Sequence, residues 1–205
     1  QFAPAALERT FAATEEYAQI ISEYGVDKIR FVATSASRDA KNREEFFSGI
    51  KERLGVIPEV ISGNEEATLS FSGATASFKD EDEPVLLVDI GGGSTEFVLG
   101  QRGKVIDTIS TNMGSVRVFE RYLAPVIADA KRGDGSLDPR QTPGMAKALI
   151  KATSAIDELI DEADRKLGLD RARTLIGVAG TVTTITAHAL GLEEYQPEKI
   201  HGSRI

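Results

Sequence analysis

The segment that most constrains the fold is an apolar run that ends in an aspartate and is followed at once by three glycines. Residues 85–90 (VLLVDI) have the length and composition of a buried strand, and Gly91, Gly92 and Gly93 follow. Because glycine has no Cβ, this segment turns tightly and aims successive N–H groups at one point, as in an anion-binding nest. Residues 94–99 (STEFVL) then alternate like a second strand, so the helix dipole of a P-loop is not expected here.

Two carboxylates, Asp89 and Glu96, flank these glycines. A hard cation held by carboxylate, water and phosphate oxygens is the usual arrangement for magnesium in proteins. The alternative is a glycine-rich hairpin turn with two solvated acids. The strand that carries Asp89 and the Ser-Thr-Glu sequence after the glycines favour the anion and cation site.

Hydrophobic periodicity and turn residues predict an alternation of strands and helices along the chain. This pattern indicates an α/β fold, with a largely parallel sheet in the first part. Helices are expected over residues 5–24, 42–54, 116–123, 143–167 and 182–190, with a further one ending near residue 78, and strands over residues 28–33, 58–61, 85–90, 94–99, 104–110 and 174–178.

Composition and charge exclude several functional classes. The net charge of −8 argues against wholesale electrostatic binding of nucleic acid or of an anionic membrane. The absence of cysteine excludes disulfides, thiolate catalysis and cysteine zinc sites. No apolar run approaches the roughly 20 residues of a transmembrane helix, and the N-terminus lacks the features of a signal peptide. We therefore expect a cytoplasmic protein with neither nucleic acid nor membrane as a partner.

Five segments, in this order, resemble the Ppx/GppA family of exopolyphosphatases and guanosine pentaphosphate phosphohydrolases. They are residues 32–40 (VATSASRDA) with Asn42, 61–67 (ISGNEEA), 89–96 (DIGGGSTE), 114–117 (GSVR) and 179–184 (AGTVTT). The resemblance implies an actin-like architecture of two ribonuclease-H-like domains around a phosphate-binding cleft. It also implies Mg²⁺ as the cofactor, polyphosphate or guanosine pentaphosphate as the substrate, and a homodimer.

The resemblance also implies that the chain is truncated at both ends. Members of the family carry an earlier phosphate loop of the Asp-x-Gly-x-Asn-Ser type, and nothing before Thr34 matches it. They also continue beyond the position of Ile205. The acidic run at residues 79–84 is the best candidate for a domain junction. We therefore assign residues 1–80 to the C-terminal part of the first actin-like domain and residues 81–205 to most of the second.

Glu65 and Glu66 compete for the role of the group that activates water. Neighbours on a helix point about 100° apart, so only one of them can face a cleft. Ser62 and Glu65 fit a capping box, in which Glu65 folds back onto the backbone of Ser62. That interpretation leaves Glu66 for catalysis, and the catalytic glutamate of the family maps to the same position.

The remaining site residues are assigned from the motifs. Arg38 follows a strand end and is expected to reach the charge of the substrate, since guanidinium suits bidentate phosphate contact; a salt bridge is the alternative. Arg117 lies in the first turn of a helix, where a cation is mildly disfavoured and an anionic neighbour or a salt bridge is expected. The metal candidates are Asp89 and Glu96. The phosphate-binding candidates are Gly91, Gly92, Gly93, Ser94, Thr95, Arg117, Gly180 and Thr181.

Three functions are compatible with these motifs. The leading hypothesis is a hydrolase that releases terminal phosphate by magnesium-assisted in-line attack of water. The second is an actin-like sugar or metabolite kinase that uses the same loop for ATP, although such kinases usually use an aspartate as the base. The third is a non-catalytic module that senses polyphosphate or nucleotide. The retained carboxylates Glu66, Asp89 and Glu96 favour catalysis, because a pure binder of polyanions gains from losing negative charge.

Overall fold

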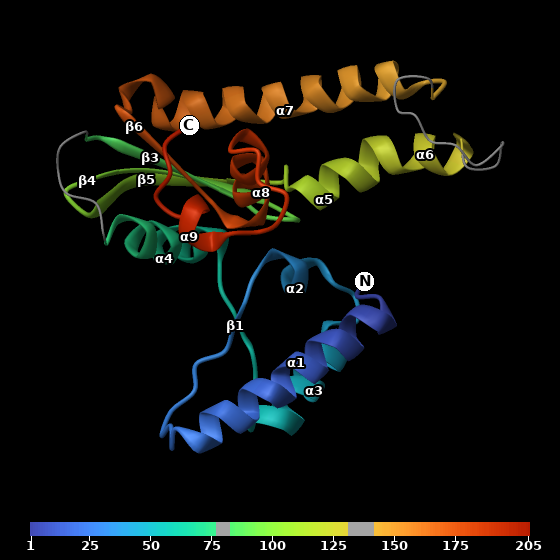
Figure 1. The fold of residues 1–205 in the computed structure, drawn as a ribbon, viewed down its shortest axis with the longest axis vertical. Coiled ribbons are helices and arrows are strands. Elements are labelled where there is room, and N and C mark those ends of the chain that lie inside the picture. The colour runs from blue at the N-terminus through green and yellow to red at the C-terminus, as the bar shows by residue number, and fades with distance from the viewer. Residues whose placement is uncertain (77–82, 131–141) are drawn as a thin grey trace. The chain divides into compact units, whose positions relative to one another are not determined.

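The computed structural model describes residues 1–76, 83–130 and 142–205, and it divides the chain into two compact units, Gln1–Glu66 and Ala67–Ile205 (Figure 1). Each unit contains both helices and strands and has a hydrophobic core of its own. Within the described residues, none of the helices has the length and apolar composition of a transmembrane span.

The first unit consists of two long helices packed together beside a short parallel strand pair. Its core contains the buried side chains of Leu7, Phe46 and Ile50, with several partly buried phenylalanines around them. A Cβ at Gly49 would overlap the ring of Phe11, so α1 and α3 approach closely at this point. The elements are α1 (Pro4–Glu23), β1 (Val32–Ala33), α2 (Ser35–Asp39), α3 (Arg43–Leu54) and β2 (Glu59–Val60).

The strands of this unit are shorter than predicted. Val32–Ala33 pairs in parallel with Glu59–Val60, whereas the prediction extended the first strand back to residue 28. The Glu59 N–H donates to the Phe31 carbonyl and the Ile61 N–H to the Ala33 carbonyl, so two backbone bonds flank this short pair. The parallel pairing of this part is confirmed, but its strands are two residues each.

The second unit is built on a four-stranded sheet in the order β5-β4-β3-β6. The β3–β4 and β4–β5 pairs are antiparallel, and β6 is parallel to β3. The sheet is therefore mixed. Its strands are β3 (Val85–Ile90), β4 (Thr95–Gln101), β5 (Lys104–Thr111) and β6 (Thr174–Val178).

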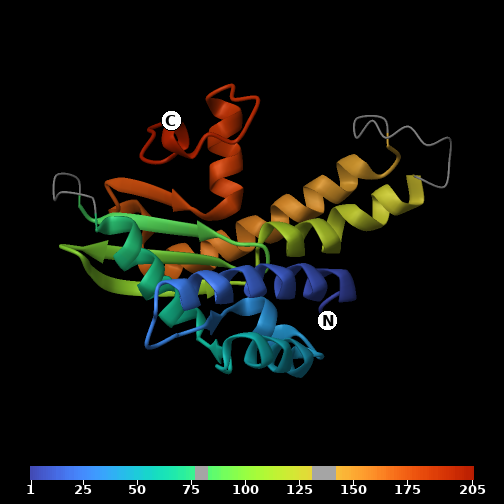
Figure 2. The ribbon, with the colours of Figure 1, turned by 60° about the horizontal axis from the view of Figure 1, so that its bottom comes forward.

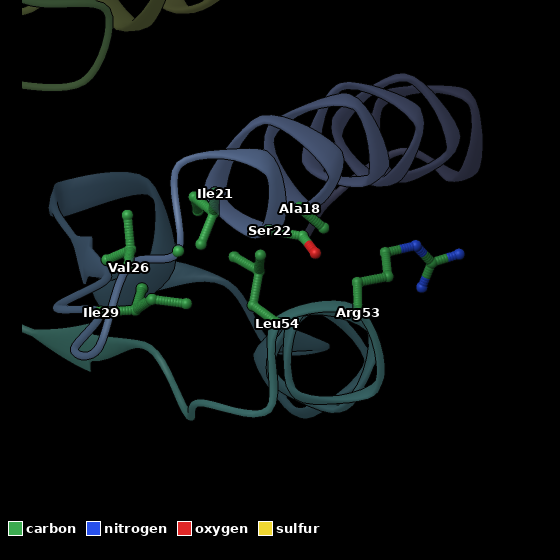
Figure 3. Close-up of a pocket in the computed structure, with 8 residues that line it drawn as sticks. Ala18, Ile21, Ser22, Val26, Ile29, Arg53 and Leu54 are labelled. Atoms are coloured by element: carbon green, nitrogen blue, oxygen red, sulfur yellow. The ribbon is translucent and has the colours of Figure 1, made fainter.

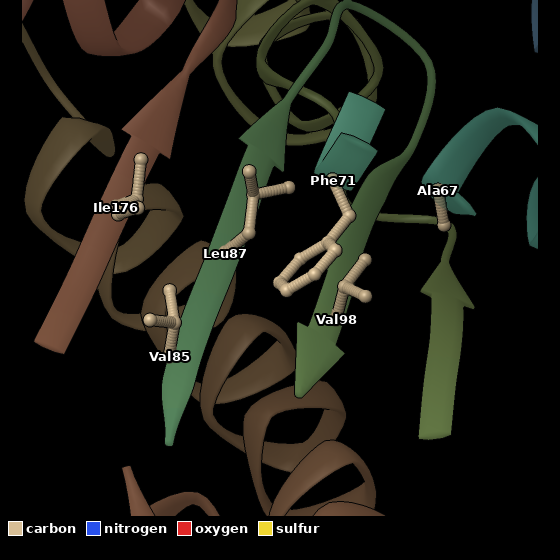
Figure 4. Packing of buried hydrophobic residues seen from close by; sticks show 6 residues of the cluster. All are labelled: Ala67, Phe71, Val85, Leu87, Val98 and Ile176. Carbon is tan, nitrogen blue, oxygen red and sulfur yellow. The ribbon is translucent and has the colours of Figure 1, made fainter. Parts of the chain in front are cut away.

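Helices cover both faces of this sheet. On one face α4 (Gly63–Thr75) buries Ala67 and Phe71 against Leu87 and Val98, and Figure 4 shows the ring of Phe71 lying over these strands. On the other face α7 (Met145–Leu167) buries Ala163 and Leu167 against Leu86 and Phe97. Figure 1 shows the two helices on opposite sides of the strands. The period-2 alternation along β3 divides its apolar residues between these two cores.

Most helix predictions for the second unit are confirmed, with two corrections. The helix predicted over residues 116–123 extends seven residues further, to Ala130. It consists of α5 (Ser115–Val118), a π-helical turn (Phe119–Leu123) and α6 (Ala124–Ala130). The last predicted helix begins three residues early, as α8 (Ala179–Ala189), directly after β6 (Figure 2). Residues 179–181 are thus the first helical turn, where the prediction placed a separate turn. The short elements Leu169–Arg171 and α9 (Pro197–Ile200) complete the unit.

The predicted domain junction at residues 79–84 falls largely on residues 77–82, which lie outside the described residues. The division between compact units falls inside α4, between Glu66 and Ala67. The reason is packing, because Ala67 and Phe71 belong to the core of the second unit. The boundary at residues 80 and 81 stays a prediction.

Replacing Gly100 with alanine is expected to destabilise the second unit. A Cβ at Gly100 would overlap the ring of Phe71, whose side chain is fully buried. Overpacking of this kind typically costs about 1–3 kcal/mol. Chemical denaturation of Gly100→Ala against the parent protein measures the effect.

Gly73→Ala is the matched control for this measurement. Gly73 lies on α4, and a Cβ there would meet nothing within 4 Å. Alanine favours a helix over glycine by about 1 kcal/mol, so this variant is expected to be slightly more stable. An unchanged free energy of unfolding for Gly100→Ala would contradict the packing described for Phe71.

Candidate functional site

The carbonyl groups of the glycine loop are all bound by one neighbouring segment. The Gly91 carbonyl accepts a hydrogen bond from the Ser115 N–H at 2.9 Å, and the Gly92 carbonyl accepts one from the Arg117 N–H at 3.0 Å. The Gly93 carbonyl accepts a bond from Nε of Arg117 at 2.6 Å. Consecutive carbonyls are thus held towards the start of α5.

This arrangement determines where the amides of the loop point. In a trans peptide the C=O of one residue and the N–H of the next lie on opposite sides of the plane. Because the carbonyls of residues 91–93 face α5, the N–H groups of Gly92, Gly93 and Ser94 face away from it. A row of backbone donors that faces one way can bind an anion. This is the polarity that the predicted phosphate loop requires, and phosphate binding by these amides stays a prediction.

Gly114 explains how the two segments come so close. A Cβ at this position would overlap the backbone of Gly92 and Gly93. Glycine is therefore required at residue 114 because the two backbones lie so close together. Its backbone conformation does not require glycine, since a φ of −67° is accessible to any residue. Arg117 supports the loop from behind through its Nε, and its predicted contact with phosphate stays a prediction.

The start of α8 is linked to the same support. Oγ1 of Thr181 donates a hydrogen bond to Oγ of Ser115 at 3.0 Å. Ala179, the first residue of α8, has a φ of 74°, which is a strained conformation for a side chain with a Cβ. The Gly180 carbonyl accepts hydroxyl bonds from Thr183 and Thr184 within the helix. Of the two predicted phosphate ligands in α8, Thr181 thus shares a hydrogen-bond chain with the glycine loop.

Ser94 and Thr95 are buried beneath the loop, with 4% and 1% of their surfaces exposed. Oγ1 of Thr95 donates to the Met113 carbonyl at 3.2 Å, and the Thr95 carbonyl accepts from Oγ1 of Thr111 at 3.0 Å. These bonds tie the start of β4 to β5 and to the segment before α5. The Thr95 hydroxyl therefore holds the frame of the loop in this structure.

Asp89 and Glu96 lie directly opposite each other on β3 and β4. Residues paired in this way project to the same face of a sheet, with Cβ atoms about 4.5–5.5 Å apart. Oδ2 of Asp89 accepts a hydrogen bond from Oγ of Ser70 at 2.6 Å, and Oε1 of Glu96 accepts one from Oγ of Ser110 at 2.7 Å. Glu96 is 1% exposed. The sequence predicted both acids but neither serine.

Asp89 and Glu96 are the residues that would hold the predicted magnesium ion. Within the described residues there is no group of three or more His, Cys, Asp or Glu side chains that could hold a metal. Mg²⁺ usually needs only one or two carboxylates, with water and phosphate oxygens completing its shell. Asp89 and Glu96, paired beside the glycine loop, supply that number of carboxylates, and the magnesium site stays a prediction.

In the first unit, the structure brings Arg38 and Glu66 together. Nη1 of Arg38 donates to the Ile61 carbonyl at 2.6 Å and lies 3.4 Å from Oε2 of Glu66. Their side chains are 28% and 19% exposed. Arg38 was predicted to contact the substrate. Here its guanidinium contacts the glutamate that was predicted to be catalytic, which corresponds to the salt-bridge alternative.

Glu65 does not complete the predicted capping box. Its N–H donates to Oγ of Ser62 at 3.1 Å, so the serine does cap α4. The Glu65 carboxylate, however, accepts from Arg30 at 2.9 Å instead of folding back onto the Ser62 backbone. Hydrogen bonds from Arg30 to Glu59 and to Glu65 raise the pKa of Arg30. A charged donor outcompetes a backbone amide for this carboxylate, and Glu65 still has a structural role distinct from Glu66.

Of two hollows in the described residues, one contains a predicted site residue and the other contains none. One, of about 370 Å³, lies between α1 and α3 and is lined by apolar side chains such as Ile21 and Leu54 with Arg53 at its edge (Figure 3). It contains none of the predicted site residues. The other, of about 170 Å³, is lined by Arg117, Arg121 and residues of α7. It lies beside the segment that supports the glycine loop.

Comparison with known families gives one match over nearly the whole chain. A model described as the Ppx/GppA phosphatase family matches residues 1–199. Exopolyphosphatase 2 of Mycobacterium tuberculosis is 37% identical over 210 residues, which cover 100% of this chain and 60% of that protein. A bifunctional 3-dehydroquinate synthase/phosphatase of Fusobacterium nucleatum is 35% identical over 98% of this chain and 28% of that protein. The chain thus spans 60% of the length of the curated exopolyphosphatase that it matches.

Solved structures share the fold. The crystal structure of an exopolyphosphatase-like protein superposes with a TM-score of 0.87 at 46% identity, covering 100% of this chain and 61% of that one. A Ppx/GppA family member from Aquifex aeolicus gives a TM-score of 0.65 at 30% identity, covering 99% and 59%. An exopolyphosphatase from Cytophaga hutchinsonii gives 0.74 at 25% identity, covering 97% and 59%. The fold class predicted from the sequence is confirmed.

Replacing Gly114 with alanine is expected to displace the glycine loop and weaken anion binding. The added Cβ would overlap the backbone of Gly92 and Gly93, which has no flexible side chain to move aside. Titration with inorganic phosphate, followed by the amide NMR shifts of Gly92 and Gly93, measures binding in the parent protein and the variant. Gly73→Ala serves as the control for a harmless added methyl. Equal phosphate affinity in Gly114→Ala and the parent would contradict the nest.

Proposed function

Because the chain belongs to the Ppx/GppA phosphatase family, we propose that it forms the phosphate-binding core of a hydrolase that releases terminal phosphate from inorganic polyphosphate. The observation that supports this most directly is the glycine loop, whose carbonyls are bound from behind while its amides face outwards. The similarity to exopolyphosphatase 2 of Mycobacterium tuberculosis favours polyphosphate as the substrate. Guanosine pentaphosphate is the second candidate, because the family model covers both activities by name.

The glycine loop binds the terminal phosphate in this mechanism. The N–H groups of Gly92, Gly93 and Ser94 donate to its non-bridging oxygens and are fixed before the substrate arrives. Phosphoryl transfer depends on positioning and on positive charge around those oxygens. Asp89 and Glu96 would hold Mg²⁺, which supplies that charge when it is bound.

Glu66 activates the attacking water. Its carboxylate accepts a proton as the water oxygen bonds to the terminal phosphorus, and the bridging P–O bond breaks on the opposite side. The products are inorganic phosphate and a chain shorter by one phosphate. Arg38, with Nη1 3.4 Å from Oε2 of Glu66, orients that carboxylate.

The finer parts of this proposal rest on the family resemblance. A homodimer and a cytoplasmic location are predictions. Mg²⁺-dependent phosphate release is to be measured for this chain and for a longer form of the protein, since the chain spans 60% of the length of its curated relative. Transfer of phosphate from ATP to an added acceptor, without free phosphate, would favour the kinase. Tight binding without turnover by the longer form would favour the sensing module.

Glu66→Gln is expected to lower the rate of phosphate release from polyphosphate by at least about 100-fold, the usual contribution of a general base. The glutamine keeps the shape of the side chain but cannot accept the proton. The matched control is Glu65→Gln, one residue earlier, because that carboxylate bonds Arg30. A steady-state phosphate assay measures both variants, with thermal unfolding to check the fold. Near-parental turnover by Glu66→Gln would remove this residue from the mechanism.

Asp89→Asn and Glu96→Gln are each expected to raise the Mg²⁺ concentration needed for half-maximal turnover by about tenfold or more. Losing a charged ligand costs at least about 1.4 kcal/mol of binding free energy, and that amount is tenfold in affinity. The rate of phosphate release is measured across a Mg²⁺ titration, with a chelator giving the rate in the absence of Mg²⁺. The Mg²⁺ concentration at half-maximal turnover is then compared between each variant and the parent protein. Full turnover in chelator would exclude the magnesium mechanism.

A further inference from the structure

Four polar side chains form one continuous row across the face of the sheet that α4 covers. Oγ of Ser110 on β5 donates to Glu96 on β4, Glu96 lies opposite Asp89 on β3, and Asp89 accepts from Oγ of Ser70 on α4. We propose that Ser70 and Ser110 are positioning residues that orient the two carboxylates for cation binding. This inference rests on the proposed function, because it assigns Asp89 and Glu96 to the same ion.

Each serine engages a single oxygen of its carboxylate. Ser70 bonds Oδ2 of Asp89 at 2.6 Å, and Ser110 bonds Oε1 of Glu96 at 2.7 Å. The terminal torsion of a carboxylate is broad when nothing holds it. A short hydroxyl bond to one oxygen fixes that torsion and leaves the second oxygen to face a ligand. Carboxylates that bind metals are commonly oriented by such hydrogen bonds from outside the metal shell.

The charge of the row also favours a cation. Like charges directly opposite each other on paired strands destabilise a sheet, and Glu96 is almost completely buried. In the part of the chain that the structure describes, neither Asp89 nor Glu96 forms a salt bridge with Lys or Arg. Serine donates a hydrogen bond without neutralising the charge. A bound cation would offset the repulsion within this acidic pair.

Ser70 has a second consequence because of its place on α4. It follows Glu66 by four residues, so the two side chains leave the same face of this helix one turn apart. The Ser70–Asp89 bond ties that face of the helix to the end of β3. Ser70 thus adds a polar contact between α4 and the carboxylate pair to the apolar packing that anchors this helix.

The test measures cation affinity without substrate, using Mn²⁺ by electron paramagnetic resonance and Mg²⁺ by competition. We expect Ser70→Ala and Ser110→Ala each to bind the ion about 10–100-fold more weakly, as is typical when an orienting residue outside the metal shell is removed. Ser70→Thr retains a hydroxyl and is expected to restore most of the affinity. Ser72→Ala is the matched control, because Oγ of Ser72 is exposed and bonds the Thr68 carbonyl within α4.

Thermal unfolding in chelator separates orientation from stability. A serine with a purely structural role would lower the unfolding temperature of the metal-free protein and leave cation affinity unchanged, and that result would overturn the inference. Asp89→Asn separates this inference from the proposed function. If Asp89→Asn loses the ion while both serine variants bind it normally, the positioning role is wrong and the proposed function stands. If Asp89→Asn binds the ion normally, the assignment of the cation to this pair fails, and the inference fails with it.

Discussion

The site depends on the hydrogen bonds that hold the glycine loop from behind. Residues 91–93 have no side chains to fix them. A flexible loop would lose conformational entropy when it binds an anion, and that loss would weaken binding. The bonds from Ser115 and Arg117 to these carbonyls impose that order in advance. They form only because Gly114 lets the two backbones approach. The order of the proposed phosphate loop thus comes from the contact between two segments 24 residues apart in the chain.

One face of the sheet in the second unit carries both an apolar pair that packs against α4 and an acidic pair at the ends of the same strands. Near the middle of β3 and β4, Leu87 and Val98 pack against Phe71, while at the end of the same strands Asp89 and Glu96 stand opposite each other. The period-2 geometry of strands places both pairs on the same side. The apolar pair anchors α4, and Asp89 of the acidic pair accepts a hydrogen bond from the Ser70 hydroxyl on that helix. Packing against α4 therefore also sets the position of Ser70 over the carboxylates.

Much of the fold could be predicted from the sequence because its signals are local. Burial of apolar side chains predicts the strand at residues 85–90 and the amphipathic helix at residues 143–167. The glycines after residue 90 predict a turn, because they have no Cβ. Residues 28–33 show the limit of such signals. They read as a strand, yet only Val32–Ala33 pairs, because the partner strand that folding supplies, Glu59–Val60, is two residues long.

The sequence by itself determined the family, the α/β class and the residue types of the site: a glycine loop, two carboxylates beside it, and Glu66 on a helix. Only the tertiary structure decided what these groups contact. It directed Arg117 to the loop backbone and Arg38 to Glu66, and it brought a serine hydroxyl to each carboxylate. The physical reason is that glycine turns, strand alternation and helix caps act between near neighbours in the chain, whereas a hydrogen-bond partner is chosen among all groups that folding brings within about 3 Å.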